Sequence, residues 1–261
     1  MKEDAILLAN IKDKMEQALH KNMLTNSLFL DSRQRALADS LCKGYKEPKA
    51  LFYGGYPEAE RTVGIFLPDY IGADDDAQLV DYFVDNPDDN PIALLRISKD
   101  TFSTLDHRDY LGSIMALGVK REMLGDILVR DDGCDVVVSK SIVKFLENNL
   151  QKAGRGTLSA EIIGAESIIT PEQKTEDKLC VVASLRLDSA VSTAYNISRT
   201  LAAAAISKGI VSLNGLQIQK ADAKIAQGDK IVLRGKGKVV VKELAGETKK
   251  GRLKILFQKF I

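Results

Sequence analysis

Between residues 91 and 163 the chain alternates short strand-type and helix-type hydrophobic patterns in a definite order. Apolar runs predict four strands and amphipathic stretches predict two helices. In chain order these elements lie at 92–97, 106–117, 127–129, 136–138, 141–151 and 157–163. The turn Asp131-Asp132-Gly133 separates the two middle strands. The resulting order, βαββαβ, predicts one α+β domain.

This is the split-βαβ or ferredoxin-like order, which RRM domains share. RRM domains stack RNA bases on an aromatic-rich strand of the type K/R-G-F/Y-G/A-F-V-x-F/Y. That signature is absent, and the strand candidates Gly125–Val129 and Cys134–Val138 contain no aromatic residue. The topology alone therefore does not predict an RNA-binding sheet.

The first 75 residues predict a smaller α+β unit. Helical spacing of apolar residues runs from Glu3 to about Met23, and a second helix is expected from Asp31, as N-cap, to Gly44, as C-cap. Strand-like runs follow at 50–53 and 62–67. We therefore expect an N-terminal unit at 1–75 and a ferredoxin-like domain at 76–172.

An acidic stretch spans the junction between these two regions. There is no Lys or Arg from Thr62 to Leu95, whereas eight aspartates fall there: Asp69, Asp74, Asp75, Asp76, Asp81, Asp85, Asp88 and Asp89. The favoured interpretation is a solvated loop and helix start. Metal binding and contact with a basic partner remain alternatives, but the EF-hand spacing and its closing Glu are missing.

The net charge of +1 conceals two oppositely charged segments. Residues 178–261 contain 16 Lys or Arg against 5 Asp or Glu, a net charge of +11, which leaves a net charge of −10 for residues 1–177. Such asymmetry suggests a module for nucleic acid or an anionic surface joined to a body of different purpose. The short polar segment from Pro171 to Asp177 is expected to be the linker.

Cysteine and histidine usage excludes several site types. Cys42, Cys134 and Cys180 are far apart, and the two histidines are His20 and His107. No zinc-ligand spacing or disulfide framework can be built from them, so we predict reduced, mostly buried thiols and no metal or cofactor. A catalytic Cys–His pair is disfavoured. Without a membrane-spanning run or a secretory signal, a cytoplasmic location is expected.

The basic segment predicts two helices followed by short strands. After an extended approach at 179–185, Asp188 is expected to cap a helix running to Ala194, and Ser198 a second helix that stops at Gly209. Turns at Asn214-Gly215 and Gly228-Asp229 bound short strands. The closing Lys249-Lys250-x-Arg252 is expected to belong to a solubilising basic tail.

Several of these residues, in order and spacing, resemble the α-L RNA-binding motif first seen in ribosomal small-subunit protein four. They are Arg186-Leu187-Asp188, Ser198-Arg199, Ile206-xx-Gly209, Val211-xx-Asn214-Gly215, Gly228-Asp229 and Arg234-Gly235. The resemblance implies an α-L RNA-binding domain at 178–261 that recognises structured RNA by shape and phosphate contacts. The residues expected to contact RNA are Arg186, Ser198, Arg199, Lys208, Asn214, Lys220, Arg234, Lys236 and Lys238.

Upstream segments extend the resemblance to most of the chain. Residues 52–61 (FYGGYPEAER), 107–113 (HRDYLGS) and 118–127 (GVKREMLGDI) resemble the YlmH family of bacterial proteins. The family implies a protein without enzymatic activity that binds rRNA on the large ribosomal subunit and takes part in ribosome-associated quality control. Contact with peptidyl-tRNA stays open, and neither DNA nor membrane is an expected partner.

His107-Arg108-Asp109 also opens the catalytic loop of protein kinases. That interpretation fails because the Asn required five residues after the Asp is Ile114, and neither D-F-G nor a glycine-rich loop is present. A helix start capped by Asp106 is favoured. The alternative is a second contact to RNA or a partner by His107, Arg108, Lys120 and Arg121.

Two rival functions remain at this point. Pseudouridine synthases pair an α-L domain with a catalytic body whose active-site Asp lies in an R-L-D motif. Here Arg186-Leu187-Asp188 lies inside the small basic module, with no large body after it. The second rival is a cell-division-related adaptor that acts through protein contacts of the acidic body.

Overall fold

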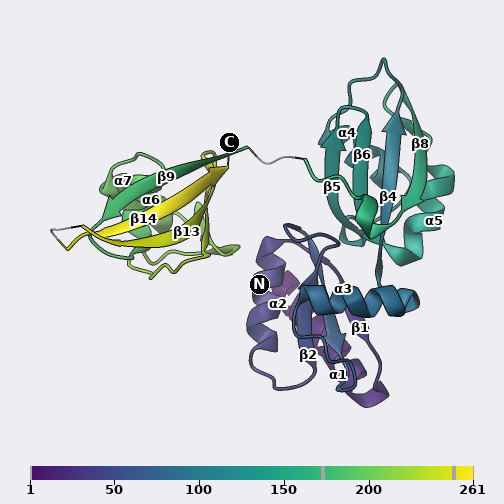
Figure 1. Ribbon diagram of the computed structural model, residues 1–261, viewed down its shortest axis with the longest axis horizontal. Helices are drawn as coiled ribbons and strands as arrows, with labels where there is room; N and C mark the ends of the chain where they lie inside the picture. Colours follow the sequence, from purple (N-terminus) through teal and green to yellow (C-terminus); the bar gives the residue numbers. More distant parts are fainter. Residues whose placement is uncertain (1, 172–173, 249–250, 261) are drawn as a thin grey trace. The chain divides into compact units, whose positions relative to one another are not determined.

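The computed structural model describes residues 2–171, 174–248 and 251–260. The chain forms two compact units, residues 1–171 and residues 172–261 (Figure 1). Both combine helices with antiparallel strands, which confirms the expected mixture of α and β structure. The finer division at 1–75, 76–172 and 178–261 stays a prediction. No helix in the described ranges is long and hydrophobic enough to cross a bilayer.

The first unit begins with the two predicted helices, α1 (Lys2–Lys21) and α2 (Ser32–Cys42). Asp31 is the N-cap of α2: its carboxylate accepts a hydrogen bond from the Gln34 backbone N–H, and the Gln34 side chain accepts one from the Asp31 N–H. This capping box satisfies two N–H groups that the helix leaves unpaired. The prediction of Gly44 as C-cap is wrong by one residue, because Lys43 holds that position in an ordinary right-handed conformation.

These helices pack on a three-stranded sheet of order β1-β3-β2. The strands are β1 (Thr25–Leu30), β2 (Lys49–Tyr53) and β3 (Thr62–Leu67). Strands β2 and β3 were predicted, whereas β1 was not. Ile11 and Met15 of α1 and Ala38 of α2 bury against Phe66 of β3, which forms one small core.

Helix α3 (Asp76–Asp85) lies in the acidic stretch and begins at the N-cap Asp75, whose carboxylate accepts a hydrogen bond from the Gln78 N–H. Its Leu79 and Phe83 are buried in a core cluster that also contains residues of β3 and of the following sheet. The helix start expected in this stretch is therefore present. Among the residues described, no group of three or more His, Cys, Asp or Glu is arranged to hold a metal ion.

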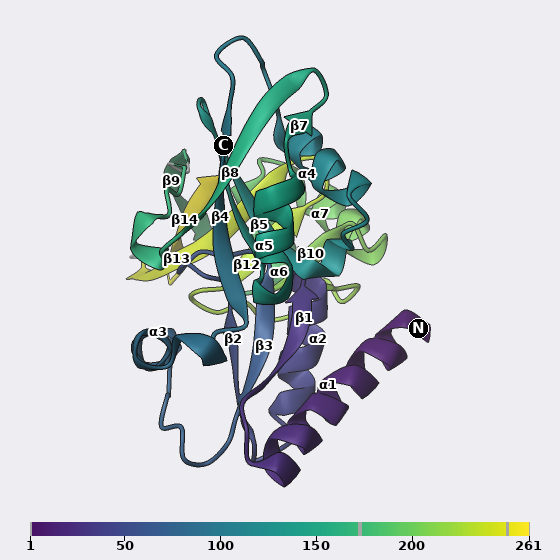
Figure 2. The ribbon, with the colours of Figure 1, turned by 90° about the vertical axis from the view of Figure 1, so that its right-hand side faces the viewer.

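The rest of the first unit is one antiparallel sheet of order β5-β6-β4-β8-β7. Its elements are β4 (Ile92–Lys99), α4 (His107–Ala116), β5 (Leu124–Arg130), β6 (Gly133–Ser139), α5 (Lys140–Asn149), β7 (Lys152–Ala153) and β8 (Gly156–Ile163). Apart from the short β7, this is the predicted βαββαβ order. Both helices cover one face of the sheet, where Tyr110 and Leu146 pack on Ile97 and Val136 (Figures 1 and 2).

Two segments quoted above for their family resemblance, 52–61 and 118–127, contact each other. The Asp126 carboxylate accepts hydrogen bonds from the Tyr56 hydroxyl (2.7 Å) and from the Glu60 backbone N–H (2.7 Å). The Arg61 guanidinium donates to the backbone carbonyl of Leu124 (2.9 Å). These residues therefore tie the N-terminal sheet to the central sheet, so their role in this chain is structural.

The second unit has one six-stranded antiparallel sheet of order β11-β10-β12-β13-β14-β9. Its elements are β9 (Thr175–Val182), α6 (Leu187–Ala194), α7 (Arg199–Ser207), β10 (Val211–Leu213), β11 (Leu216–Gln217), β12 (Lys230–Leu233), β13 (Gly237–Glu247) and β14 (Leu253–Phe260). Val191 and Ile206 of the helices bury against Val239 and Phe257 of the sheet. Asn214 and Gly215 both have positive φ, as the predicted tight turn requires.

The structure corrects two predictions at the ends of this unit. Residues Thr175 to Asp177, expected to be linker, belong to β9 and pair with β14. The expected basic tail instead contains β14, the central partner of β9 and β13. Lys249 and Lys250 lie outside the described residues. The linker prediction failed for a non-local reason: β9 is an edge strand that, among the described strands, pairs only with β14, about seventy residues further along the chain.

Candidate functional site

The first turns of α6 and α7 hold two arginines on one carboxylate. Asp188 accepts hydrogen bonds from Nε and Nη2 of Arg186 (both 3.1 Å) and from Nε and Nη2 of Arg199 (3.1 Å from Nε). The Asp188 side chain is 7% exposed, whereas those of Arg186 and Arg199 are 41% and 53% exposed. We call these three residues the Asp188 cluster.

The prediction that Asp188 caps a helix is wrong. Arg186 occupies the N-cap position of α6 without a side-chain cap, and Asp188 lies inside the helix. Burial raises the pKa of the Asp188 carboxyl, but the hydrogen bonds and charges of Arg186 and Arg199 outweigh this, so its pKa lies below the ordinary value. The carboxylate is therefore charged at neutral pH and orients both guanidinium groups.

The orientation leaves donors available. Each arginine uses Nε and Nη2 for Asp188, and no hydrogen bond from either Nη1 to a described residue is present. Arg199 also lies at the N-terminus of α7, where backbone N–H groups favour an anion, whereas the first N–H groups of α6 are taken by protein carbonyls. A guanidinium binds phosphate through paired N–H donors. The arrangement can therefore bind an anion such as a backbone phosphate.

Backbone contacts bring two lysines to the same place. Leu187 and Asp188 donate their N–H groups to the carbonyls of Ala223 and Ala221, and Arg186 forms a β-bridge with Lys224. Lys220 precedes this segment, and both lysines are exposed. Lys220 was predicted, whereas Lys224 was missed because no local pattern reveals a bridge across almost forty residues.

The other predicted residues of this unit have different roles. The Ser198 hydroxyl caps α7 by accepting a hydrogen bond from the Leu201 N–H (3.2 Å). The Asn214 side chain braces the turn through Asp229 (2.8 Å) and the Lys230 N–H (2.9 Å), so it shapes the surface. Lys238 places its ammonium 4.1 Å from the centre of the Phe260 ring.

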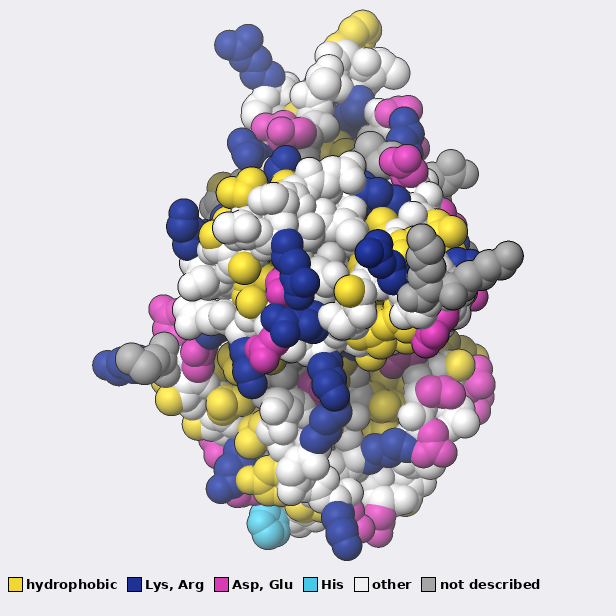
Figure 3. Space-filling view, turned by 90° about the vertical axis from the view of Figure 1, so that its left-hand side faces the viewer, with side chains coloured by type: hydrophobic (Ala, Val, Ile, Leu, Met, Phe, Trp, Pro, Cys, Tyr) yellow, Lys and Arg dark blue, Asp and Glu magenta, His cyan; other side chains and the backbone are white. Residues whose placement is uncertain are grey.

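The remaining cations lie on neighbouring backbone. Arg234 donates its N–H to the carbonyl of Ile210, two residues after Lys208, and Lys236 follows in the same β12–β13 turn. Lys208, Arg234 and Lys236 are exposed. Figure 3 shows one face of the molecule, with exposed Lys and Arg side chains among acidic and hydrophobic ones.

The four candidates of the central region do not form one site. His107 and Arg108 are exposed at the start of α4, whereas Lys120 and Arg121 follow its end, about 15 Å away for a ten-residue helix. The Arg121 guanidinium donates to the carbonyls of Leu124 (2.8 Å) and Gly125 (3.1 Å). Burial lowers the pKa of Arg121, with the charge of Arg61 adding to the effect. Its role in the fold is thus structural.

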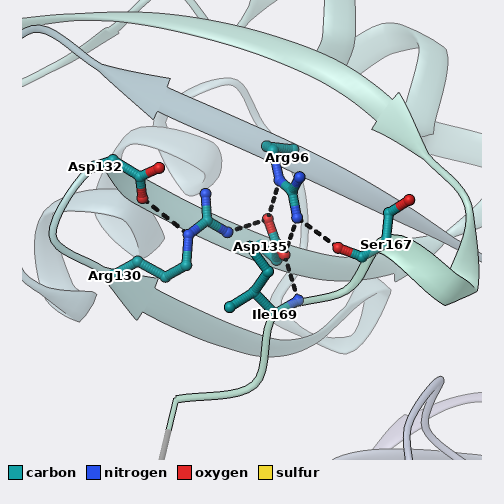
Figure 4. Close-up of polar contacts among 6 residues, drawn as sticks. All are labelled: Arg96, Arg130, Asp132, Asp135, Ser167 and Ile169. Atoms are coloured by element: carbon teal, nitrogen blue, oxygen red, sulfur yellow. Dashed lines mark hydrogen bonds and ion pairs between the residues drawn. The ribbon is translucent and has the colours of Figure 1, made fainter.

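The helix-free face of the central sheet is occupied by the protein itself. Asp135, on β6, accepts hydrogen bonds from Arg96 Nε (2.9 Å) and Nη2 (2.8 Å), from Arg130 and from the Ile169 N–H (2.9 Å) (Figure 4). Arg96 also donates to the Ser167 carbonyl (2.6 Å). Hydrogen bonds therefore hold the segment at 167–169 against the sheet face on which an RRM would stack bases.

The chain is similar to proteins that are already known. A family model described as "Putative RNA-binding domain in YlmH" matches residues 86–166, which include the whole central sheet. The chain is 27% identical over 249 residues to "Ribosome-associated protein quality control protein P2" of Bacillus subtilis (strain 168), covering 94% of this chain and 90% of that protein.

A solved structure is also similar, "Cell division protein ylmH from Streptococcus pneumoniae". It has a TM-score of 0.49 and 20% sequence identity, and the likeness covers 64% of this chain and 95% of that one. The matched segment of the family model includes two of the motifs quoted above, 107–113 and 118–127. The chain is therefore similar to the YlmH family in its RNA-binding domain at 86–166, and to the Bacillus subtilis quality-control protein over most of its length.

Proposed function

We propose that this protein binds structured RNA through its second unit and acts in ribosome-associated quality control on the large ribosomal subunit, without catalysis of its own. Its partners would be rRNA and peptidyl-tRNA on the large ribosomal subunit. It would act in the cytoplasm. The Bacillus subtilis relative carries the quality-control role in its name, and the matched family model carries RNA binding. The proposal also takes the central sheet as ferredoxin-like and the second unit as an α-L domain.

The observation that carries the proposal is the Asp188 cluster. A buried carboxylate holds two half-exposed arginines at two helix N-termini, with Lys220 and Lys224 beside them. The two arginines share a single carboxylate, so the cluster keeps a net positive charge at the surface. A polyanion that binds this charge releases its own counterions.

The test is binding of the full-length protein to large ribosomal subunits and to rRNA extracted from them, at several salt concentrations. We expect co-sedimentation with the subunit and an affinity for rRNA that falls with a log–log slope of about 0.7–0.9 per phosphate contacted. The variant Lys220→Ala/Lys236→Ala should reduce that slope by about one to two units without changing the melting temperature.

The control is Lys12→Ala/Lys43→Ala, two exposed lysines of the first unit that pair only with carboxylates of their own helices. This variant should leave the slope unchanged. Binding that does not depend on salt would contradict phosphate contact by the second unit. Arg186→Ala/Arg199→Ala is unsuitable as the primary test. It leaves the Asp188 carboxylate without its hydrogen-bond partners, so a loss of binding could come from a loss of stability.

A further inference from the structure

The loop between β4 and α4 presents an aromatic side chain to solvent. It projects beyond the end of the central sheet in Figures 1 and 2. Phe102, in this loop, is 97% exposed, while the next most exposed large hydrophobic side chain among the described residues, Val84, is 74% exposed. A phenylalanine in this position contributes almost nothing to the core and leaves its ring open to a ligand.

The loop is held in place by its own hydrogen bonds. The Asp100 carboxylate accepts from the N–H groups of Phe102 (3.0 Å), Ser103 (2.9 Å) and Thr157 (2.7 Å). Lys99 Nζ donates to the Ser103 carbonyl (2.7 Å). The Thr157 and Ser103 hydrogen bonds hold the pKa of Asp100 below its ordinary value, although burial opposes them. Phe102 therefore lies in a turn that the hydrogen bonds of Asp100 hold in one conformation.

Two exposed arginines belong to elements at the same end of the central sheet. The loop packs directly on the β7–β8 hairpin, since a Cβ on Gly156 would lie 2.6 Å from the Ser103 hydroxyl oxygen. Arg155, in the tight turn of that hairpin, is exposed, as is Arg108 in the first turn of α4. The carboxylate of Asp106 at this end accepts hydrogen bonds from backbone N–H groups.

Acidic side chains also lie nearby. The β5–β6 turn at the same end of the sheet holds Asp131, which is exposed, and Asp132, which pairs with Arg130. The region therefore combines one exposed aromatic ring on a loop with one arginine in a hairpin turn, one arginine at a helix start and acidic side chains. We call Phe102, Arg155 and Arg108 the loop-end surface.

We infer that the loop-end surface is a second RNA contact, at which Phe102 stacks on an unpaired base while Arg155 and Arg108 bind the adjoining phosphates. Unpaired bases stack on aromatic side chains irrespective of sequence, and arginines beside the ring supply backbone contacts. The usual sheet-face alternative is closed by Asp135 and the 167–169 segment. This inference rests on the proposed function, and it adds where the first unit contacts RNA.

The sequence makes a direct test available, because the chain contains no tryptophan. In the full-length protein, Phe102→Trp introduces a single tryptophan, which can be excited selectively, at the proposed stacking position. Titration with rRNA extracted from large subunits should quench its emission strongly, since a stacked base quenches indole fluorescence. Val84→Trp, exposed on α3, is the matched control and should change little. A fully paired RNA duplex should quench neither variant.

Affinity gives the second readout. Phe102→Ala should weaken binding to the same rRNA by about tenfold or more, whereas Phe102→Tyr should keep it within about twofold. Circular dichroism should be unchanged, because Phe102 packs on nothing that folding needs.

The outcomes separate this inference from the proposed function. If wild-type protein binds rRNA, but rRNA leaves the emission of the Phe102→Trp variant unchanged and Phe102→Ala keeps wild-type affinity, the loop-end surface is not an RNA contact and the proposed function stands. If Phe102→Ala loses subunit co-sedimentation without losing rRNA affinity, the loop contacts a protein and the inference is wrong. If wild-type protein binds no RNA, both fail.

Discussion

The central sheet and the second unit each contain an aspartate held by two arginines, yet the two clusters differ in what faces water. Around Asp135 the arginines are withdrawn: the side chains of Arg96 and Arg130 are 21% and 10% exposed, and that of Asp135 is fully buried. In the Asp188 cluster both arginines are about half exposed.

The two clusters differ in whether each arginine has a second hydrogen-bond partner besides the shared aspartate. Arg96 also donates from Nη2 to the Ser167 carbonyl, and Arg130 donates from Nε to Asp132, so each arginine of that cluster has a second partner within the protein. Arg186 and Arg199 have no such additional described partners. The same three-residue arrangement therefore holds a segment in one place and leaves two arginines exposed to solvent in the other.

Neutralising the buried carboxylate tests the first half of this contrast and should have the largest effect. Asp135→Asn leaves two poorly exposed guanidinium groups without a counter-charge, which should lower the free energy of unfolding by about 3 kcal/mol in urea titrations. Asp131→Asn, in the exposed β5–β6 turn, is the matched control and should have almost no effect. Equal stability of the two variants would mean that the 167–169 segment does not depend on Asp135.

Replacing arginine by lysine tests the second half at constant charge. Arg186→Lys/Arg199→Lys keeps both cations but removes the planar guanidinium groups, so rRNA affinity should fall by about tenfold with an unchanged salt slope. Arg96→Lys in the central sheet should instead lower stability and leave rRNA affinity unchanged. The comparison fails if both substitutions affect the same property.

Acid titration should show the smallest difference. Burial raises the pKa of Asp135, but Arg96, the Ile169 N–H and Arg130 outweigh it, so the folded pKa is depressed, as it is for Asp188. A depressed carboxyl pKa stabilises the fold above the unfolded value of about 4, and this stabilisation is lost as the pH falls through the folded pKa.

Melting temperatures measured from pH 6 down to pH 2 should therefore decline less steeply in Asp135→Asn than in the wild type. Asp188→Asn should flatten the curve less, because its exposed arginines make the cluster worth about 1 kcal/mol or less. An equal flattening by both variants would remove the energetic distinction between the clusters.

The elements that the sequence predicted correctly are those defined by local patterns. Helical periodicity identified α1 and α4, and side-chain caps at Asp31 and Ser198 fixed helix starts to the residue. These signals operate within one or two turns, so a single segment carries all the information needed.

What the sequence did not predict depends on residues far apart in the chain. Strand β14 pairs with β9 across the whole second unit, and its basic flank resembled a tail. Asp188 had the residue type of a cap, but two arginines, one eleven residues away, decide its role. The RNA contacts themselves stay predictions, although the structure shows which candidates are already committed to the fold.

The three cysteines provide a built-in means of following the parts of this molecule separately. Cys42, Cys134 and Cys180 are all buried free thiols, and each lies in a different hydrophobic core cluster. Burial raises the pKa of the Cys42 thiol to about 11 and raises the pKa of the other two. Alkylation thus requires local opening, and the order in which the three sites become labelled, read by mass spectrometry, would rank the lifetimes of the closed states around them.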